Sequence, residues 1–200
     1  MPPEKRRQQL LAAAKKLFTK KGYRGTTTEE IARRARLTKG ALYHHFKSKE
    51  EILMALVHDM HCRYDEIMVR ASQGDASPLT LLTELLNVHQ REDMSDLRNM
   101  IDLRIQAMRI PAIKRHMDNL AAAAISEFAA SLDPKYGADL KTREQLVILV
   151  LSLYNGLAFR KNMKPSTVDI PMQLLLFEKF QNGLVNSNTG KRKRGSDKTM

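Results

Sequence analysis

The fold of the N-terminal quarter is decided by residues 26–49, which read TTTEEIARRARLTKGALYHHFKSK. A threonine followed by two glutamates is typical of a helix N-cap, and we expect that helix to end near Arg34. A tight turn over residues 35–37 then leads to Thr38, which should cap a second short helix. Apolar residues at helical spacing would pack the two helices together. They are Ile31, Ala32, Ala35, Leu37, Leu42 and Phe46. The stretch therefore predicts a helix-turn-helix.

Positive charge is concentrated in the same quarter of the chain. Among 200 residues, 34 Lys and Arg outnumber 22 Asp and Glu, which gives a formal net charge of +12. Residues 1–50 carry 14 basic and 4 acidic side chains, whereas residues 51–185 carry 15 and 17. A basic head on a near-neutral body is expected of a nucleic-acid-binding unit joined to a domain with another task.

The composition also limits the class of protein. With 42% hydrophobic and 28% charged residues, the chain can build a folded core. The single cysteine, Cys62, excludes an internal disulfide and fits a reducing compartment. We find no apolar run of eighteen residues, and no apolar segment behind the basic N-terminus. We therefore expect a cytoplasmic protein with no secretory signal and no membrane partner.

The rest of the chain is helical in pattern. Apolar residues recur at intervals of three and four, and strand-like alternation is absent, so we expect an all-α fold of about nine helices. The segments divide the chain into a head at 1–48, a helical body at 49–185, and a basic tail at 186–200 without regular structure. The helices expected beyond the head are 49–71, 78–91, 94–108, 111–132, 142–162 and 168–185.

The second helix of the head leaves side chains exposed that suit the major groove of DNA. Gly40 and Ala41 are small, so the backbone can approach base edges, and Lys39 can reach guanine acceptors. Tyr43 and His44 can reach phosphates or bases. Packing of Tyr43 against the following long helix is the alternative. The orientation of the neighbouring imidazole at position 45 stays open.

Leu10–Leu53 resembles the N-terminal domain of the TetR family of bacterial transcriptional regulators. The resemblance implies a homodimer that reads a palindromic operator in double-stranded DNA, and repression relieved by a small-molecule effector. It also implies that residues 49–185 form an effector-binding and dimerisation domain, in which 49–71 is the connecting helix. The residues that carry the resemblance are Phe18, Gly22, Tyr23, Thr26, Thr27, Ile31, Ala32, Ala35, Lys39, Gly40, Leu42, Tyr43, Phe46, Lys49 and Glu50.

Arg36 departs from the family pattern, which usually has glycine at this position of the turn. A left-handed backbone at an arginine costs about 1–2 kcal/mol. The alternative is that Arg36 adds a contact to a DNA phosphate. The exposed residues of the second helix, the positions that the family uses and Arg36 together form one set of predicted DNA contacts. They are Thr27, Arg36, Thr38, Lys39, Gly40, Ala41, Tyr43, His44 and Lys49.

Two C-terminal helices favour a dimer. Residues 146–159 are apolar on nearly all sides, and such a helix must be covered on more than one side. We expect two helices from each subunit to meet in a four-helix contact. A single core helix that is well covered within its own subunit is the alternative. The predicted interface residues are Leu149, Leu153, Leu157, Met172, Leu176 and Phe180.

The middle helices carry stripes of methionine and alanine, which suit an adaptable pocket for the effector. Ordinary core packing explains such stripes more often. Polar groups beside apolar faces are the better indicators, and Arg104 would suit an anionic ligand or an internal carboxylate. The predicted ligand-binding residues are His89, Arg104, Met108, Met117, Phe128, Tyr154 and Asn155.

His58, His61, Cys62 and Asp65 recur at spacings of three and four, which is compatible with a soft metal or a redox sensor. We favour a solvated or packed helix, because a metal site needs ligands from more than one helix. We therefore predict neither a metal nor a cofactor. The basic run 191–194 is a solvated tail, with added non-specific DNA affinity as the alternative.

The sequence contains no phosphate loop, nucleophile elbow or metal motif of firm spacing, so we expect no enzyme. A DNA-compacting or membrane-surface protein would spread its basic residues along an amphipathic face. Here they surround a compact two-helix unit. The sequence therefore predicts a DNA-binding transcriptional regulator whose partners are an operator, a second copy of itself and an unidentified small molecule.

Overall fold

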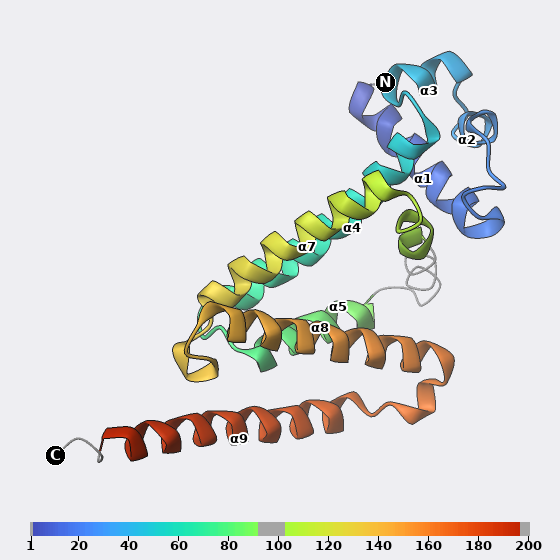
Figure 1. Ribbon diagram of the computed structural model, residues 1–200. Helices are drawn as coiled ribbons and strands as arrows, with labels where there is room; N and C mark the ends of the chain where they lie inside the picture. The colour runs from blue at the N-terminus through green and yellow to red at the C-terminus, as the bar shows by residue number, and fades with distance from the viewer. Residues whose placement is uncertain (1, 92–102, 197–200) are drawn as a thin grey trace. The chain divides into compact units, whose positions relative to one another are not determined.

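The computed structural model describes residues 2–91 and 103–196 (Figure 1). No strand occurs among these residues, which confirms the predicted all-α fold class. None of the helices described is long and apolar enough to cross a membrane. The α-helices are α1 (Pro3–Lys21), α2 (Thr28–Arg34), α3 (Lys39–His45), α4 (Lys49–Ser72), α5 (Pro78–Arg91), α7 (Pro111–Ser131), α8 (Leu140–Met163) and α9 (Ile170–Ser196). The 3-10 helices η1 (Pro134–Tyr136) and η2 (Pro165–Thr167) and a helical segment at 103–107 accompany them.

Proline and glycine mark several helix boundaries, as the sequence predicts. Helix α1 ends at Gly22, whose φ of 75° is costly for residues with a side chain. Helices α5 and α7 each begin at a proline, which fits the first turn because no N–H donor is needed there. Helices α8 and α9 begin within two residues of the expected positions. The helix expected at 94–108 lies largely outside the described residues, and its part at 103–107 is helical.

The C-terminal end of α9 differs from the expectation. The helix continues through Ser196, so residues 186–196, which we expected to lack regular structure, are helical. This segment contains no proline, and its run of lysine and arginine has good helix propensity. These properties outweigh its two glycines, so a polar composition alone was a poor guide here.

The chain forms two compact units whose limits differ from the expected domain boundary at residue 48. The first comprises the described residues among Met1–Arg63 and Ser95–Leu120. The second comprises those among Tyr64–Met94 and Ala121–Met200. Helices α4 and α7 therefore each contribute their N-terminal part to the first unit and their C-terminal part to the second.

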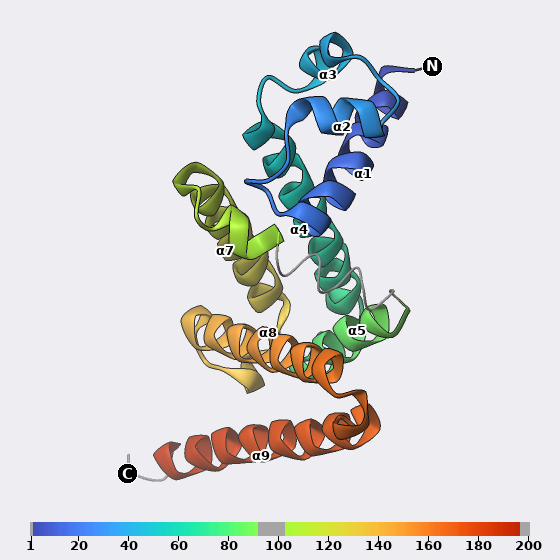
Figure 2. The same ribbon diagram turned by 90° about the vertical axis from the view of Figure 1, so that its right-hand side faces the viewer.

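The core of the first unit joins α1, α2 and α3 to α4. Figure 2 shows α1, α2 and α3 gathered at the start of α4. Phe18 of α1, Ile31 of α2, Leu42 of α3 and Ile52 of α4 are all buried in this core. Leu103, from the helical segment at 103–107, is buried in the same core. The predicted packing residues of the helix-turn-helix thus lie where the apolar spacing placed them, with Ala35 and Leu37 partly buried.

The second unit packs α5 against α8 and α9. Leu81, Leu82, Leu85 and Leu86 of α5 are at most 1% exposed. Gln181 of α9 is also buried, and its Oε1 accepts the backbone N–H of residue 79 at 2.8 Å. The amide of that glutamine therefore pairs with one of the N–H groups that the start of α5 leaves without a helical partner.

Candidate nucleic-acid interface

The start of α2 is fixed by a capping box. The N–H of Glu30 donates to Oγ1 of Thr27 at 3.2 Å, and the N–H of Thr27 donates to Oε2 of Glu30 at 3.1 Å. Both residues thereby satisfy donors that the first helical turn leaves unpaired. Thr27 is the N-cap, and its hydroxyl is engaged in the cap.

The turn between α2 and α3 closes around Arg36. The N–H of Leu37 donates to the carbonyl of Ala32 at 2.9 Å, and the N–H of Arg36 donates to that of Arg33 at 3.1 Å. This pair of bonds is the Schellman pattern, which requires a left-handed residue after the helix. Arg36 has a φ of 55°, so it adopts that conformation without being glycine. It is the one such non-glycine residue in the described part of the chain.

Helix α3 begins at a second cap and presents a small-residue opening. Oγ1 of Thr38 accepts the N–H of Ala41 at 3.1 Å. Gly40 is exposed, and a Cβ built on it would meet only the hydroxyl oxygen of Thr38, at 3.9 Å. Packing within the protein therefore does not require glycine at this position. This favours a requirement imposed from outside, such as the close approach of DNA.

The polar side chains of α3 are tied to α2. The hydroxyls of Tyr43 and Thr28 share a hydrogen bond of 3.2 Å. Lys39 forms an ion pair with Glu29 and lies 5.8 Å from the centre of the Tyr43 ring. The hydrogen bond from Lys39 lowers the pKa of Glu29 to about 2, and the same bond raises the pKa of Lys39. The two side chains predicted to read DNA are thus held by neighbours on α2.

The structure gives the exposure of two predicted DNA contacts, Tyr43 and His44. Tyr43 is 44% exposed, so it is not packed under α4, which was the alternative. His44 is exposed, whereas His45 is half-buried, and their rings meet edge to face with centres 5.3 Å apart. The face of α3 that carries Lys39, Gly40, Tyr43 and His44 is therefore open to a partner.

Lys49 has a structural role that the sequence did not reveal. Its Nζ donates to the carbonyls of Tyr23 at 2.9 Å and Thr26 at 2.8 Å, and it lies 4.4 Å from the centre of the Tyr23 ring. The ammonium thereby binds the loop between α1 and α2 to the first turn of α4. A contact of Lys49 with a DNA phosphate stays a prediction.

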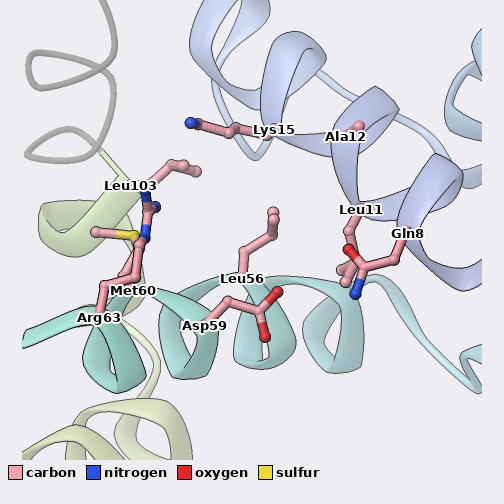
Figure 3. A pocket seen from close by; sticks show the side chains of 9 residues that line it. All are labelled: Gln8, Leu11, Ala12, Lys15, Leu56, Asp59, Met60, Arg63 and Leu103. Atoms are coloured by element: carbon pink, nitrogen blue, oxygen red, sulfur yellow. The ribbon is translucent and has the colours of Figure 1, made fainter. Parts of the chain in front are cut away.

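A cavity of about 170 Å³ lies between α1 and α4 in the first unit (Figure 3). Leu11, Leu56, Met60 and Leu103 form its apolar wall. Its polar lining residues are Gln8, Lys15, Asp59 and Arg63. Small-molecule pockets usually have volumes of about 300–1,000 Å³, so this cavity is small for an effector. None of the predicted ligand-binding residues lines it.

The predicted ligand-binding residues are distributed over both units. Met117 is buried in the core of the first unit, and Phe128 is buried in the second. Tyr154 is buried, and its ring lies 6.3 Å from that of Tyr64. Of the remainder, Met108 and Asn155 are exposed, Arg104 is half-buried, and the side chain of His89 lies outside the described structure. Their role in binding stays a prediction.

Large apolar side chains remain exposed on α8 and α9. Leu149, Met172, Leu176 and Phe180 are 47–52% exposed. Leu153 is half-buried, and Leu157 is only 8% exposed because it packs inside its own subunit. Ile148 and Leu175, which are not among the predicted interface residues, are also exposed. Each adjoins a predicted interface residue along its helix.

The histidine and cysteine residues of α4 do not form a metal centre in the described structure. His58 Nε2 and Cys62 Sγ are 3.6 Å apart, and the ring of His116 on α7 lies 5.7 Å from that of His58. Within residues 2–91 and 103–196, no group of three His, Cys, Asp or Glu side chains is arranged to hold a metal ion. The pair and its neighbour therefore give no support to the metal-sensing alternative.

Part of this chain is similar in sequence to known bacterial regulators. Residues 10–56 match the family model described as bacterial regulatory proteins, tetR family. The chain is 40% identical over 71 residues to the HTH-type transcriptional repressor KstR2 of Rhodococcus jostii, covering 34% of this chain and 35% of that one. The first curated relatives are thus matched over about a third of their length.

Solved structures share the fold of nearly the whole chain. GusR of Salmonella enterica superposes with a TM-score of 0.68 at 22% identity, covering 95% of this chain and 96% of that one. The multidrug binding protein EbrR, solved in complex with imidazole, superposes with a TM-score of 0.59 at 19% identity, covering 92% and 94%. At these identities the likeness establishes the fold.

Proposed function

We propose, from the match of residues 10–56 to the tetR family of bacterial regulatory proteins, that this chain represses transcription as a homodimer bound to an operator and is released by a small molecule. The matched family and its relatives are regulators of transcription and not enzymes. The observation that carries the proposal is the exposed face of α3. There Gly40 has open space around it, and exposed Lys39, Tyr43 and His44 surround it.

This face suits direct reading of bases. A helix enters the major groove when small residues let its backbone approach, and flanking cations and hydroxyls then meet guanine acceptors and phosphates. The N-caps Thr27 and Thr38 define where the two helices begin, and the turn at Arg36 joins them.

The exposed apolar residues of α8 and α9 support the homodimer. Four large side chains near 50% exposure on two neighbouring helices leave apolar surface that a second copy would cover. The two copies of α3 must then lie about 34–36 Å apart to enter successive major grooves. Palindromic operators follow from the twofold symmetry of such a dimer.

Release by a ligand requires that ligand binding in the helical body affects the DNA-binding head. Helices α4 and α7 each contribute residues to both compact units. A ligand that displaces these helices in the second unit therefore also displaces the residues that they contribute to the first. A hundredfold loss of operator affinity requires about 2.7 kcal/mol of preference of the ligand for the released state. The structural relative EbrR binds imidazole, which supports a small-molecule effector.

The decisive experiment is an in vitro selection of randomised duplex DNA by the purified protein at physiological salt. We expect an inverted repeat to be enriched. Recovery of no motif, together with binding that vanishes as salt rises, would instead favour a sequence-independent basic DNA-binding protein.

A matched variant tests whether α3 does the reading. Gly40→Leu has room within the protein, so it should fold with an unchanged helical spectrum. It should fail to enrich the repeat, because the larger side chain keeps the backbone from the base edges. Enrichment of the same repeat by Gly40→Leu would show that α3 does not approach the bases as proposed.

A further inference from the structure

A basic groove of about 490 Å³ lies in the first unit between α1 and the end of α2. The turn that follows α2 forms one wall. The groove is floored by three alanines and edged by one amide and three cationic side chains. Its lining residues are Gln9, Ala12, Ala13, Lys16, Arg34, Ala35 and Arg36. Small side chains create the hollow, and long basic ones surround it.

The three cations are not neutralised by the protein. Lys16, Arg34 and Arg36 are all exposed, and none forms an ion pair with another described residue. Other basic residues of the same unit differ, since Lys21 pairs with Glu30 and Lys39 with Glu29. Like charges gathered around a concave surface raise the positive potential inside it, which attracts an anion.

The backbone at Arg36 supplies a second, independent observation. Its left-handed conformation is strained for any residue with a Cβ, and glycine would adopt it freely. Backbone strain of this kind is concentrated at functional positions. The strained residue here carries one of the three cations of the groove.

A purely structural explanation covers only part of the pattern. Arginines in the last turn of a helix interact favourably with the helix dipole, which accounts equally for Arg33 and Arg34 of α2. It accounts neither for Lys16, which lies on another helix, nor for Arg36, which lies beyond the end of α2. The groove also lies next to α3 along the chain, because Arg36 stands two residues before the N-cap Thr38 of that helix.

We infer that this groove binds backbone phosphates of the DNA beside the segment that α3 reads. The inference rests on the proposed function and extends the predicted set of DNA contacts to Lys16, Arg34 and Gln9. These contacts carry no sequence information. They hold the head in register on the duplex and make binding dependent on salt.

The test is the salt dependence of operator binding by the full chain, measured on the repeat recovered in the selection. Each phosphate contact contributes about 0.9 to the slope of log K against log salt concentration. We expect Lys16→Gln, Arg34→Gln and Arg36→Asn each to reduce the slope by about 0.9 per subunit. They should weaken operator and unrelated DNA alike and leave the selected sequence unchanged. Asparagine is used at position 36 because it tolerates the left-handed conformation.

Matched controls separate the groove from net charge and from the helix dipole. Lys20→Gln removes an exposed cation from α1, and Arg33→Gln removes the neighbour of Arg34 on α2. Neither residue lines the groove, so both variants should keep the full slope. Arg36→Lys retains the charge and should keep the full slope as well.

The outcomes are distinct. If the wild-type protein binds no DNA, the proposed function fails and the inference fails with it. If the wild-type protein binds its repeat but the three groove variants keep the full slope, the inference alone is overturned. Stabilisation of the wild type by tripolyphosphate, lost in those variants while the DNA slope is unchanged, would assign the groove to a free phosphorylated ligand and also overturn it.

Discussion

The ammonium of Lys39 on α3 forms an ion pair with the carboxylate of Glu29 on α2, on the face that we assign to DNA. Both side chains are more than half exposed. DNA must therefore compete with a carboxylate of the protein for the cation most suited to guanine. A correct base, which offers two acceptors at fixed positions, competes better than an isolated phosphate. We therefore expect the pair to limit non-specific binding.

Substitution of Glu29 should increase the affinity for unrelated DNA. In Glu29→Gln, Lys39 is released, and we expect affinity for unrelated DNA to rise about threefold, in keeping with the modest strength of exposed ion pairs. Operator affinity should rise less, so discrimination falls. Glu66→Gln, which removes an exposed carboxylate from α4, is the control. An equal rise in both variants would mean that net charge is the cause.

The depressed pKa of Glu29 makes a pH prediction. Its pKa of about 2 lies below the value of about 4.3 expected in the unfolded chain, so its ionised form favours the folded state. That contribution is fully present above about pH 4.3 and is lost as the pH falls towards 2. The difference in DNA affinity between Glu29→Gln and wild type should therefore be constant from about pH 6 to 8. Titration of the carboxyl carbon by NMR measures the pKa directly, and a value near 4 would contradict the ion pair in solution.

Loss of the Lys49 ammonium should destabilise the head. Lys49→Met leaves two carbonyls of the loop between α1 and α2 without their charged donor, at a cost of about 2 kcal/mol. We expect Tm to fall by about 4–8 °C in thermal denaturation. Lys47→Met, at an exposed position just before α4, should leave Tm unchanged. If Lys49→Met weakens DNA binding at unchanged Tm, a phosphate contact is its main role.

Replacement of Arg36 by glycine should change the free energy of unfolding and the DNA affinity in opposite directions. Arg36→Gly relieves the left-handed strain, so we expect the free energy of unfolding to increase by about 1 kcal/mol and Tm by about 2–4 °C. DNA affinity should fall in the same variant, because a groove cation is lost. A lower Tm would show that the arginine side chain stabilises the turn by contacts that outweigh its backbone strain.

The dimer prediction is tested on α9. Leu176→Glu places a charge in the exposed apolar surface, where it would be buried without a partner in the dimer. Sedimentation equilibrium should show a monomer that has lost operator binding and keeps its helical spectrum. Asn182→Glu adds the same charge at an exposed position on a different side of the helix and should remain dimeric. A dimeric Leu176→Glu would exclude this surface as the interface.

Much of the head could be predicted because its signals are local. The caps Thr27 and Thr38 and the left-handed turn at Arg36 each depend on hydrogen bonds between residues at most five positions apart along the chain. The same holds for the core face of α2 and α3, where Ile31 and Leu42 are fully buried. Hydrogen bonds and packing at such short range follow from the order of the residues.

The partners of side chains could not be predicted in this way. Nothing local indicates that Lys49 bonds a carbonyl 26 residues earlier, or that Leu157 packs inward while Leu149 stays exposed on the same helix. Residues 146–159 of α8 are apolar on nearly all sides, so periodicity does not distinguish the covered face of this helix from its exposed one. The helix at the end of α9 could not be predicted from composition, because polar and basic residues suit both an irregular tail and an exposed helix.

The all-α fold, the helix-turn-helix and the small-residue opening of α3 follow from the order of the amino acids, because helical spacing and capping are properties of neighbouring residues. Which cations remain unpaired depends instead on how the helices pack. Lys39 is paired to Glu29, Lys49 is bound to a loop, and Lys16 and Arg36 meet at a groove. Charges act over distances in space and not along the chain, so their effect is fixed only when the helices have packed.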